Sequence, residues 1–183
     1  EIGKKYRLHP LALEDMVNVP QRPKAEPFDS DGEHDARLFI LVQMLQLVHG
    51  RLDSEQVSVF LGHNTVITFQ QREGDVWGPI RERLQQAGSR LRQNDASFLM
   101  YALLDAVVDH CYPLIEHYGD RLEALETQVL DEPKPETIQH LHAIKRELPL
   151  FRRQVWPLRA MVASLLREPH ERPSAMTGTY LLD

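Results

Sequence analysis

The chain has 183 residues, of which 42% are hydrophobic and 26% are charged, and its formal net charge is -6. This length allows one domain with a real core, or a compact domain with an appendage, and the composition is ordinary for a soluble globular protein. The acidic balance, without a strong cluster of Lys and Arg, argues against nucleic acid as a partner and permits cation binding. The single cysteine, Cys111, excludes an internal disulfide framework and a cysteine-based zinc site.

Neither a secretory signal nor a membrane span is expected from the sequence. The first ten residues, EIGKKYRLHP, lack the apolar centre of a signal peptide. The longest apolar runs, LFILVQMLQLV and FLMYALLDAVV, are interrupted by polar residues and are shorter than the roughly 20 residues that cross a bilayer. We therefore expect the chain as given to be soluble, in a reducing compartment.

The opening stretch, HPLALEDMVNVPQRPKAE, predicts a short helix followed by extended backbone. Pro10 suits the first helical turn, where its missing N–H would have no partner in any case. Pro20 and Pro23 end the helix and favour extended geometry. The helix carries two adjacent carboxylates, Glu14 and Asp15, between apolar residues.

Strands and a further helix complete the first part of the chain. The aliphatic run ARLFILVQMLQLV predicts a strand. The segments EQVSVFLG and TVITFQ alternate apolar and polar residues around Gly62-His63-Asn64, which is typical of a β-hairpin. A helix is expected to begin near Pro79 in GDVWGPIRERLQQA. Residues 1–93 are therefore predicted to form an α/β domain.

Residues 94–168 are predicted to form a long antiparallel helical hairpin. Asp95 or Ser97 can cap its first helix. Apolar residues then recur at alternating steps of three and four, the heptad pattern of helices that pack along their length. The first seam contains Tyr101, Leu104, Val108, Cys111, Ile115, Tyr118, Leu122, Leu125 and Val129, and the second contains Leu141, Ile144, Leu148, Phe151, Val155, Leu158, Val162 and Leu165.

Prolines mark the turn of this hairpin and also interrupt its helices. Pro133 and Pro135 lie in DEPKPE, which should form the turn and the start of the second helix. Pro113, Pro149 and Pro157 fall inside the helices and should kink them, at roughly 3 kcal/mol each unless the geometry absorbs the clash. At 1.5 Å per residue each helix would run about 50 Å, so the hairpin should project from the α/β domain.

Two pairs of carboxylates are candidate ligands for a hard divalent cation, which prefers carboxylate oxygens. Glu14 and Asp15 form the first pair, although they could instead be the solvated edge of a helix. Asp105 and Asp109 form the second, at an i,i+4 spacing on one helical face. Asp105 stands in an apolar run, where an unpaired carboxylate is costly to bury, and the alternative there is an arginine partner, for example Arg81 or Arg83.

Catalytic motifs are not evident. His140 and His142 diverge on a helix, His110 and His117 share a face without a third ligand nearby, and HExxH is absent. An Asp109-His110 dyad is disfavoured because adjacent helical residues point apart. The sequence has no Gly-rich phosphate loop, nucleophile elbow or Rossmann fingerprint. We do not expect an enzyme.

Several segments together resemble the cytoplasmic part of the CorA family of magnesium and cobalt transport proteins. HPLALEDMVN and QRPK resemble the family's opening helix and loop, and SEQVSVFLGHNTVITFQ resembles its central hairpin. GDVWGPIRERL resembles a GDVF-type helix start, with Trp77 where Phe is usual. YALLDAVVDHCYPLIE and KRELPLFRRQVWPLR resemble the helical arms, so the similarity covers nearly the whole chain in order.

The resemblance implies an α+β fold, an α/β/α sandwich with a long helical hairpin, which in the full protein assembles as a funnel-shaped homopentamer of the cell inner membrane. Opening strands would precede residue 1, and residues 169–183 would be a linker and the start of the pore-lining helix. The membrane helices with the Gly-Met-Asn signature would follow, so this chain would not conduct ions by itself. The 183 residues of this chain would be cytoplasmic. Mg²⁺ or Co²⁺ would be both the regulatory and the transported ion.

The resemblance also implies cation sites between neighbouring subunits. The family's acidic pair falls on Glu14 and Asp15, its helix carboxylate on Asp105, and the carboxylate contributed across the interface on Asp183. Asp109 lies close to this set and joins it as a further candidate. The alternatives are the zinc-transport branch of the same superfamily, an interaction module built on the hairpin, and a metal-dependent hydrolase using Asp105 and Asp109.

Overall fold

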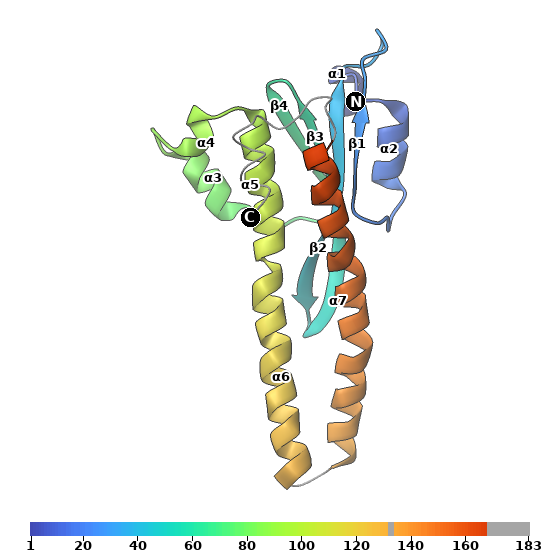
Figure 1. The fold of residues 1–183 in the computed structure, drawn as a ribbon, viewed down its shortest axis with the longest axis vertical. Helices are drawn as coiled ribbons and strands as arrows, with labels where there is room; N and C mark the ends of the chain where they lie inside the picture. The colour runs from blue at the N-terminus through green and yellow to red at the C-terminus, as the bar shows by residue number, and fades with distance from the viewer. Residues whose placement is uncertain (132–133, 168–183) are drawn as a thin grey trace.

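The computed structural model describes residues 1–131 and 134–167 of the chain. Four antiparallel strands form one sheet in the order β1-β2-β3-β4, helices lie on both of its faces, and a long helical hairpin extends from it (Figure 1). The elements are α1 (Ile2–Lys5), α2 (Pro10–Val17), β1 (Lys24–Phe28), β2 (Arg37–Val48), β3 (Arg51–Gly62), β4 (Thr65–Gln70), α3 (Gly78–Gln85), α4 (Arg90–Gln93), α5 (Ala96–Asp109), α6 (Cys111–Asp131) and α7 (Pro135–Arg167).

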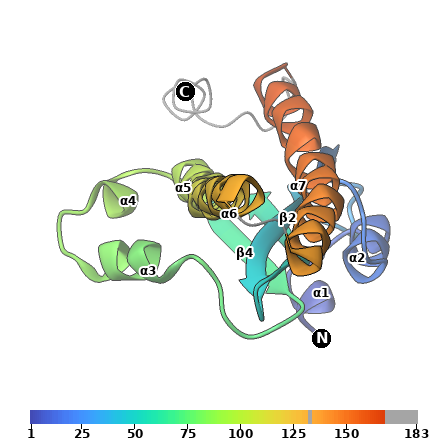
Figure 2. The same cartoon turned by 90° about the horizontal axis from the view of Figure 1, so that it is seen from below.

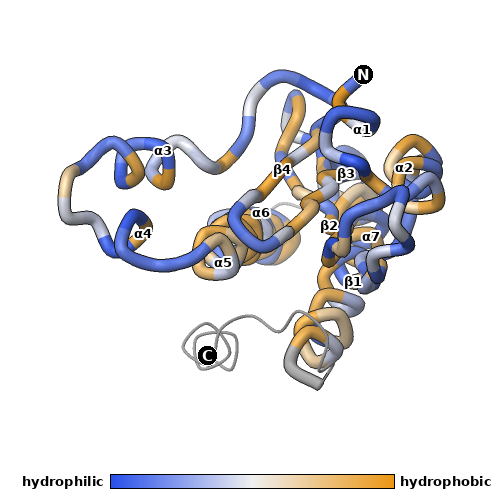
Figure 3. The backbone as a smooth tube through the Cα atoms, turned by 90° about the horizontal axis from the view of Figure 1, so that it is seen from above, coloured by the Kyte–Doolittle hydropathy of each residue, from blue (hydrophilic) through white to orange (hydrophobic). Residues whose placement is uncertain are grey.

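The sheet separates two apolar cores, because successive strand residues point to opposite faces. On one face, β2 and β3 pack against α5 and the last turns of α7. On the other face, Phe39, Leu41 and Phe60 pack against Leu8 and Ala12, which seats α2 there. Figure 2 shows α2 beyond the sheet on one side and α3 and α4 on the other. Apolar segments concentrate in the strands and α5, while α3 is largely hydrophilic (Figure 3).

The predicted strands and their hairpin are present, and one strand was missed. Pairing of β3 with β4 confirms the hairpin around Gly62-His63-Asn64. The turn between β2 and β3 uses His49 and Gly50, both with positive φ, the two-residue geometry that joins twisted strands. The missed strand, β1, contains Pro27, which an edge strand tolerates because one side of it forms no ladder.

The first long helix is interrupted where proline chemistry requires it. α5 ends at Asp109 and α6 begins at Cys111. Pro113 has no N–H to donate to the carbonyl of Asp109 and its ring would crowd that carbonyl, so the interruption lies within one turn before it. Asp95 caps α5 by accepting a hydrogen bond from the Phe98 N–H at 3.1 Å, as predicted. Pro149 and Pro157 lie inside a continuous α7.

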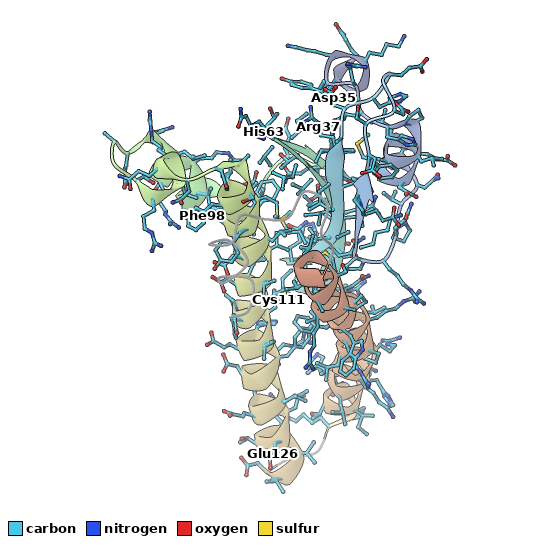
Figure 4. All side chains as sticks on the ribbon, turned by 45° about the horizontal axis from the view of Figure 1, so that its top comes forward. Asp35, Arg37, His63, Phe98, Cys111 and Glu126 are labelled. Carbon is cyan, nitrogen blue, oxygen red and sulfur yellow. The ribbon has the colours of Figure 1, made fainter. Side chains whose placement is uncertain are left out.

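The predicted heptad seam is only half correct. Cys111, Tyr118 and Leu125 are buried, but the intervening Ile115 and Leu122 are exposed. On the first helix Val108 and Val129 are also exposed, and on α7 Leu141 and Leu148. The buried side is completed by Leu114, because α5 and the upper part of α6 face the sheet as well as α7. Figure 4 shows Cys111 near the junction of α5 and α6 and Glu126 close to the hairpin tip.

One stretch of the described residues, Ala96–Asp131, is long and apolar enough for a membrane span by length and composition. From the length of the apolar runs alone, no membrane span was expected. The apolar side of α5 lies in the core against the sheet, with Met100 and Val107 fully buried. We therefore interpret this stretch as a core helix.

A hydrogen bond from the Tyr118 hydroxyl to Glu147, at 3.0 Å, joins the hairpin helices. Burial, and then the Glu147 carboxylate, raise the pKa of Tyr118 to about 12. We expect Tyr118→Phe to lower the free energy of unfolding by about 1 kcal/mol below pH 10. The stabilisation by Tyr118 is present below the ordinary pKa of about 10 and is lost as the pH rises towards 12. Denaturant unfolding from pH 8 to pH 12 should therefore show a smaller decline in the variant than in the parent, and equal declines would contradict this assignment.

Candidate functional site

The first carboxylate pair lies on α2, which local capping and packing hold in place. The His9 side chain caps the helix by accepting the Leu11 N–H at 3.2 Å, and Pro10 occupies its first position. Ala12 is 1% exposed and packs on the sheet. Glu14, two residues further along the helix, points away from the sheet and is exposed. Its backbone carbonyl accepts the Asn18 N–H at 3.0 Å, while its carboxylate makes no hydrogen bond or ion pair within the described part of the chain.

Asp15 is bound by a lysine in this structure. Its carboxylate accepts hydrogen bonds from Lys24 at 2.7 Å and from Gln21 at 3.0 Å, which lower its pKa against the opposing effect of burial. Burial alone would lower the pKa of Lys24, but its bonds to Asp15 and Glu26 outweigh burial and raise that pKa. The Lys24 ammonium group therefore neutralises the Asp15 carboxylate, as a bound cation would otherwise do.

Two buried glutamines, which are not among the residues predicted from the sequence, fix the loop beside this pair. The Gln56 amide oxygen accepts the Gln21 N–H at 2.9 Å, and its nitrogen donates to the carbonyls of Asp15 and Met16. Gln43 donates to the Gln21 carbonyl at 2.8 Å. Both glutamines are at most 3% exposed. Gln43 offered a signal, a polar residue inside an aliphatic run, whereas Gln56 fits the ordinary alternation of its strand and offered none.

The second pair, Asp105 and Asp109, lies on α5 beside a groove of about 430 Å³ between α3 and α5. Arg83 and Arg90 line the same groove. Partial burial, and next the charge of Asp109, raise the pKa of Asp105, while a hydrogen bond from Tyr101 and the charge of Arg83 oppose the rise. Of the two anticipated arginines, Arg81 pairs with Asp75, and Arg83 is nearby but does not neutralise the carboxylate.

Trp77 holds α3 against α5 at this groove. Its side chain is 3% exposed, and its indole N–H donates to the Leu103 carbonyl at 3.0 Å. Asp75 accepts the Trp77 backbone N–H at 2.8 Å and pairs with Arg81, which shapes the turn into α3. The GDVWGP segment therefore positions the wall opposite Asp105.

The structure does not bring the predicted ligands together within one chain. Glu14 and Asp15 lie on α2, on one side of the sheet, and Asp105 and Asp109 lie on α5, on the other. Within residues 1–131 and 134–167, no group of three or more His, Cys, Asp or Glu residues could hold a metal ion. Asp183 lies outside the described residues. Each half offers two carboxylates, and carboxylate oxygens are the ligands that hard divalent cations such as Mg²⁺ prefer.

Comparisons with known proteins identify the family of this chain. The family model described as CorA-like Mg2+ transporter protein matches residues 1–183. The cobalt/magnesium transport protein CorA of Thermotoga maritima is 41% identical over the whole chain, which covers 51% of that relative. The putative metal ion transporter YfjQ of Bacillus subtilis is 26% identical over 97% of the chain and 53% of its own length. The chain thus spans about half the length of these curated relatives.

Solved structures share the fold at low sequence identity. The soluble domain of CorA from Methanocaldococcus jannaschii superposes with a TM-score of 0.83 at 16% identity, covering 100% of this chain and 70% of that one. The complete CorA structure from the same organism gives a TM-score of 0.82 at 15% identity, covering 100% and 56%. The predicted α+β class is thereby confirmed. The chain belongs to the CorA-like Mg²⁺ transporter family.

Proposed function

We propose that this chain is the cytoplasmic regulatory part of a magnesium/cobalt transporter of the inner membrane, and that it senses divalent cations between neighbouring copies. Its relatives are named as magnesium, cobalt or metal ion transporters, and it spans about half their length. The transported ion, the pentameric assembly and the cytoplasmic location belong to this proposal.

The observation that carries the proposal is the placement of the two carboxylate pairs on opposite flanks of the molecule. Figure 2 shows α2 and α5 on the two sides of the sheet, so one chain cannot close a site from both pairs. Copies that are arranged head to tail present α2 of one to α5 of the next. Glu14 and Asp15 would then meet Asp105 and Asp109 across the contact.

Electrostatic interactions would decide whether this contact is closed or open. Carboxylates from two copies repel each other and disfavour the closed contact, and they attract once they share a divalent cation. A cation that binds the closed arrangement preferentially shifts the population towards it. As the cytoplasmic cation falls, the repulsion returns and the assembly loosens towards a conducting state. The transporter would thereby be under negative feedback.

The Lys24 bond to Asp15 would lower the affinity of the proposed site for a divalent cation. With the ammonium group at 2.7 Å, Asp15 is already partly neutralised in an isolated chain. A divalent cation must displace Lys24 or share Asp15 with it, which lowers affinity. A weak site is appropriate for Mg²⁺, because this ion gives up its water reluctantly.

Cation titration of the purified chain tests the proposal. We expect Mg²⁺ and Co²⁺ to raise the melting temperature progressively, since a ligand of the folded state stabilises it by mass action. The response should be lost in the Asp15→Asn plus Asp183→Asn variant. A variant in which the exposed Asp29 and Glu73 become Asn and Gln, with the same charge change away from both pairs, should respond like the parent. A response in the Asp15/Asp183 variant equal to that of the parent would refute sensing by these residues.

A further inference from the structure

A shallow groove lies between α7 and the loop that joins α2 to β1, which run beside each other in Figure 1. Its volume is about 340 Å³, at the lower end of the range of small-molecule sites, about 300–1,000 Å³. The lining residues are Arg22 from the loop and Pro149, Arg152, Arg153, Trp156 and Pro157 from α7. We call this surface the arginine groove.

One stripe of α7 forms the wall of the arginine groove. Its five lining residues follow one another at steps of three, one, three and one, so they share one face of the helix. Pro157 has no N–H for the carbonyl of Arg153, four residues earlier, so that oxygen lacks its helical donor. The wall therefore combines two cationic side chains, an aromatic ring and a backbone acceptor.

The positive charge of the groove is not balanced by acidic side chains. Within the described residues, none of Arg22, Arg152 and Arg153 has a carboxylate partner, and residues 148–167 contain no acidic residue. The whole chain has a formal net charge of -6, so these cations are a local exception. Guanidinium groups around one groove repel each other, and an anion between them replaces that repulsion by attraction. Guanidinium also binds phosphate oxygens through two parallel hydrogen bonds.

Trp156 adds a large apolar ring to this cationic surface. It is 69% exposed, whereas the other tryptophan of the chain, Trp77, is 3% exposed. The Arg152 guanidinium lies 5.5 Å from the Trp156 ring centroid, a cation–π contact that orients the ring. An exposed aromatic ring is a platform for a planar base, because every base has a π-face that can stack on it.

The loop that carries Arg22 is held in place by the residues on both sides of it. The Gln21 N–H donates to the Gln56 side chain at 2.9 Å, and the Gln21 carbonyl accepts from Gln43 at 2.8 Å. Pro23, on the other side of Arg22, is buried. The backbone of Arg22 therefore has little freedom to lose when a ligand binds, which favours affinity.

We propose that the arginine groove binds a nucleoside triphosphate. The three guanidinium groups bind the phosphates, the Trp156 ring stacks on the base, and the Arg153 carbonyl accepts a hydrogen bond from a ribose hydroxyl or a base amino group. An anion without a ring would leave Trp156 uncovered, and an uncharged nucleoside would leave the arginines unbalanced. The inference goes beyond the proposed function, because this site uses none of the carboxylates assigned to cation sensing.

Calorimetric titration of the purified chain with ATP tests the proposal, in EDTA so that no divalent cation takes part. Tripolyphosphate, which has the phosphates alone, and adenosine, which has the base and ribose alone, are titrated in the same way. One variant carries Arg152→Gln and Arg153→Gln, and a second carries Trp156→Ala. A control carries Lys4→Gln and Arg51→Gln, exposed cations outside the groove, with the same charge change as the first variant. Circular dichroism establishes that each variant is folded.

We expect ATP to bind at one site per chain, at least about tenfold more tightly than tripolyphosphate or adenosine, because it contacts both the cations and the ring. The Arg152/Arg153 variant should bind ATP at least about tenfold more weakly, while the control binds it like the parent. Trp156→Ala should weaken ATP binding about tenfold and leave the binding of tripolyphosphate unchanged.

Three results would overturn the proposal. The first is an absence of saturable ATP binding. The second is a control weakened as much as the Arg152/Arg153 variant, which would indicate only nonspecific attraction. The third is tripolyphosphate binding as tightly as ATP, or equal weakening of both by Trp156→Ala, which would show that the ring binds no base. Loss of the Mg²⁺ response with ATP binding intact would refute the sensing proposal alone.

Discussion

Trp77→Ala should lower the free energy of unfolding by about 3–5 kcal/mol, the cost of emptying a large buried aromatic site. The side chain is 3% exposed in the core between α3 and α5, and its indole N–H bonds the Leu103 carbonyl at 3.0 Å. Ile80 is the one buried residue within α3 itself, so without Trp77 at its N-terminus this helix should lose its attachment first. Denaturant unfolding followed by far-UV circular dichroism measures the loss.

Trp77→Phe is the matched control because it retains an aromatic ring and removes the indole hydrogen bond. We expect it to cost about 1–2 kcal/mol, from the lost bond and a small cavity. In the alanine variant, hydrogen exchange should be faster at the amides of α3 while those of β2 and β3 exchange mainly by global unfolding. A cost below 1 kcal/mol for Trp77→Ala would show that the indole does not anchor the groove.

Phe39→Ala should also cost about 3–5 kcal/mol, on the opposite face of the sheet. Phe39 is fully buried, with its ring centroid 4.8 Å from that of Phe60 and 6.5 Å from that of Phe28. The same cluster seats Ala12 of α2. The substitution removes the surface under the helix that carries Glu14 and Asp15, so the rise in melting temperature with Mg²⁺ should shrink as well.

Phe39→Leu keeps most of the apolar volume and should cost less than about 2 kcal/mol. Thermal and denaturant unfolding of both variants give the comparison. If Phe39→Ala lost stability as expected but bound and responded to Mg²⁺ like the parent, the position of α2 would not matter for sensing.

The strands and long helices were predictable because each carries a strong local pattern. The aliphatic run of β2, the alternation in β3 and β4, and the proline and cap signals around α2 and α5 all correspond to structure. β1 was not predicted, since KAEPF has no clear alternation and contains a proline. Only its pairing with β2 makes it a strand.

The heptad pattern could not distinguish the buried side of the hairpin from an exposed one. Val108, Ile115, Leu122 and Val129 repeat every seven residues, as do Leu104, Cys111, Tyr118 and Leu125. Only the second set faces inward, because the direction of the sheet and α7 selects it. Periodicity gives the spacing of an apolar stripe, and tertiary contacts decide which stripe is covered.

The candidate carboxylates could be predicted from the sequence, but their arrangement in space could not. The placement of α2 and α5 on opposite faces follows from the alternation of β2, where Phe39 and Ile40 point to different cores. The Lys24 bond to Asp15 and the support from Gln43 and Gln56 depend on contacts between distant parts of the chain.

Complementation between two variants tests most directly whether the cation is bound between copies. One variant carries Glu14→Gln and Asp15→Asn, and the other carries Asp105→Asn and Asp109→Asn. Each alone should lose the Mg²⁺-dependent increase in mass measured by light scattering. An equimolar mixture should regain part of it, since α2 of the second variant can meet α5 of the first with all four carboxylates intact. A mixture as unresponsive as its components, or either variant responding alone like the parent, would contradict a site shared between neighbouring copies.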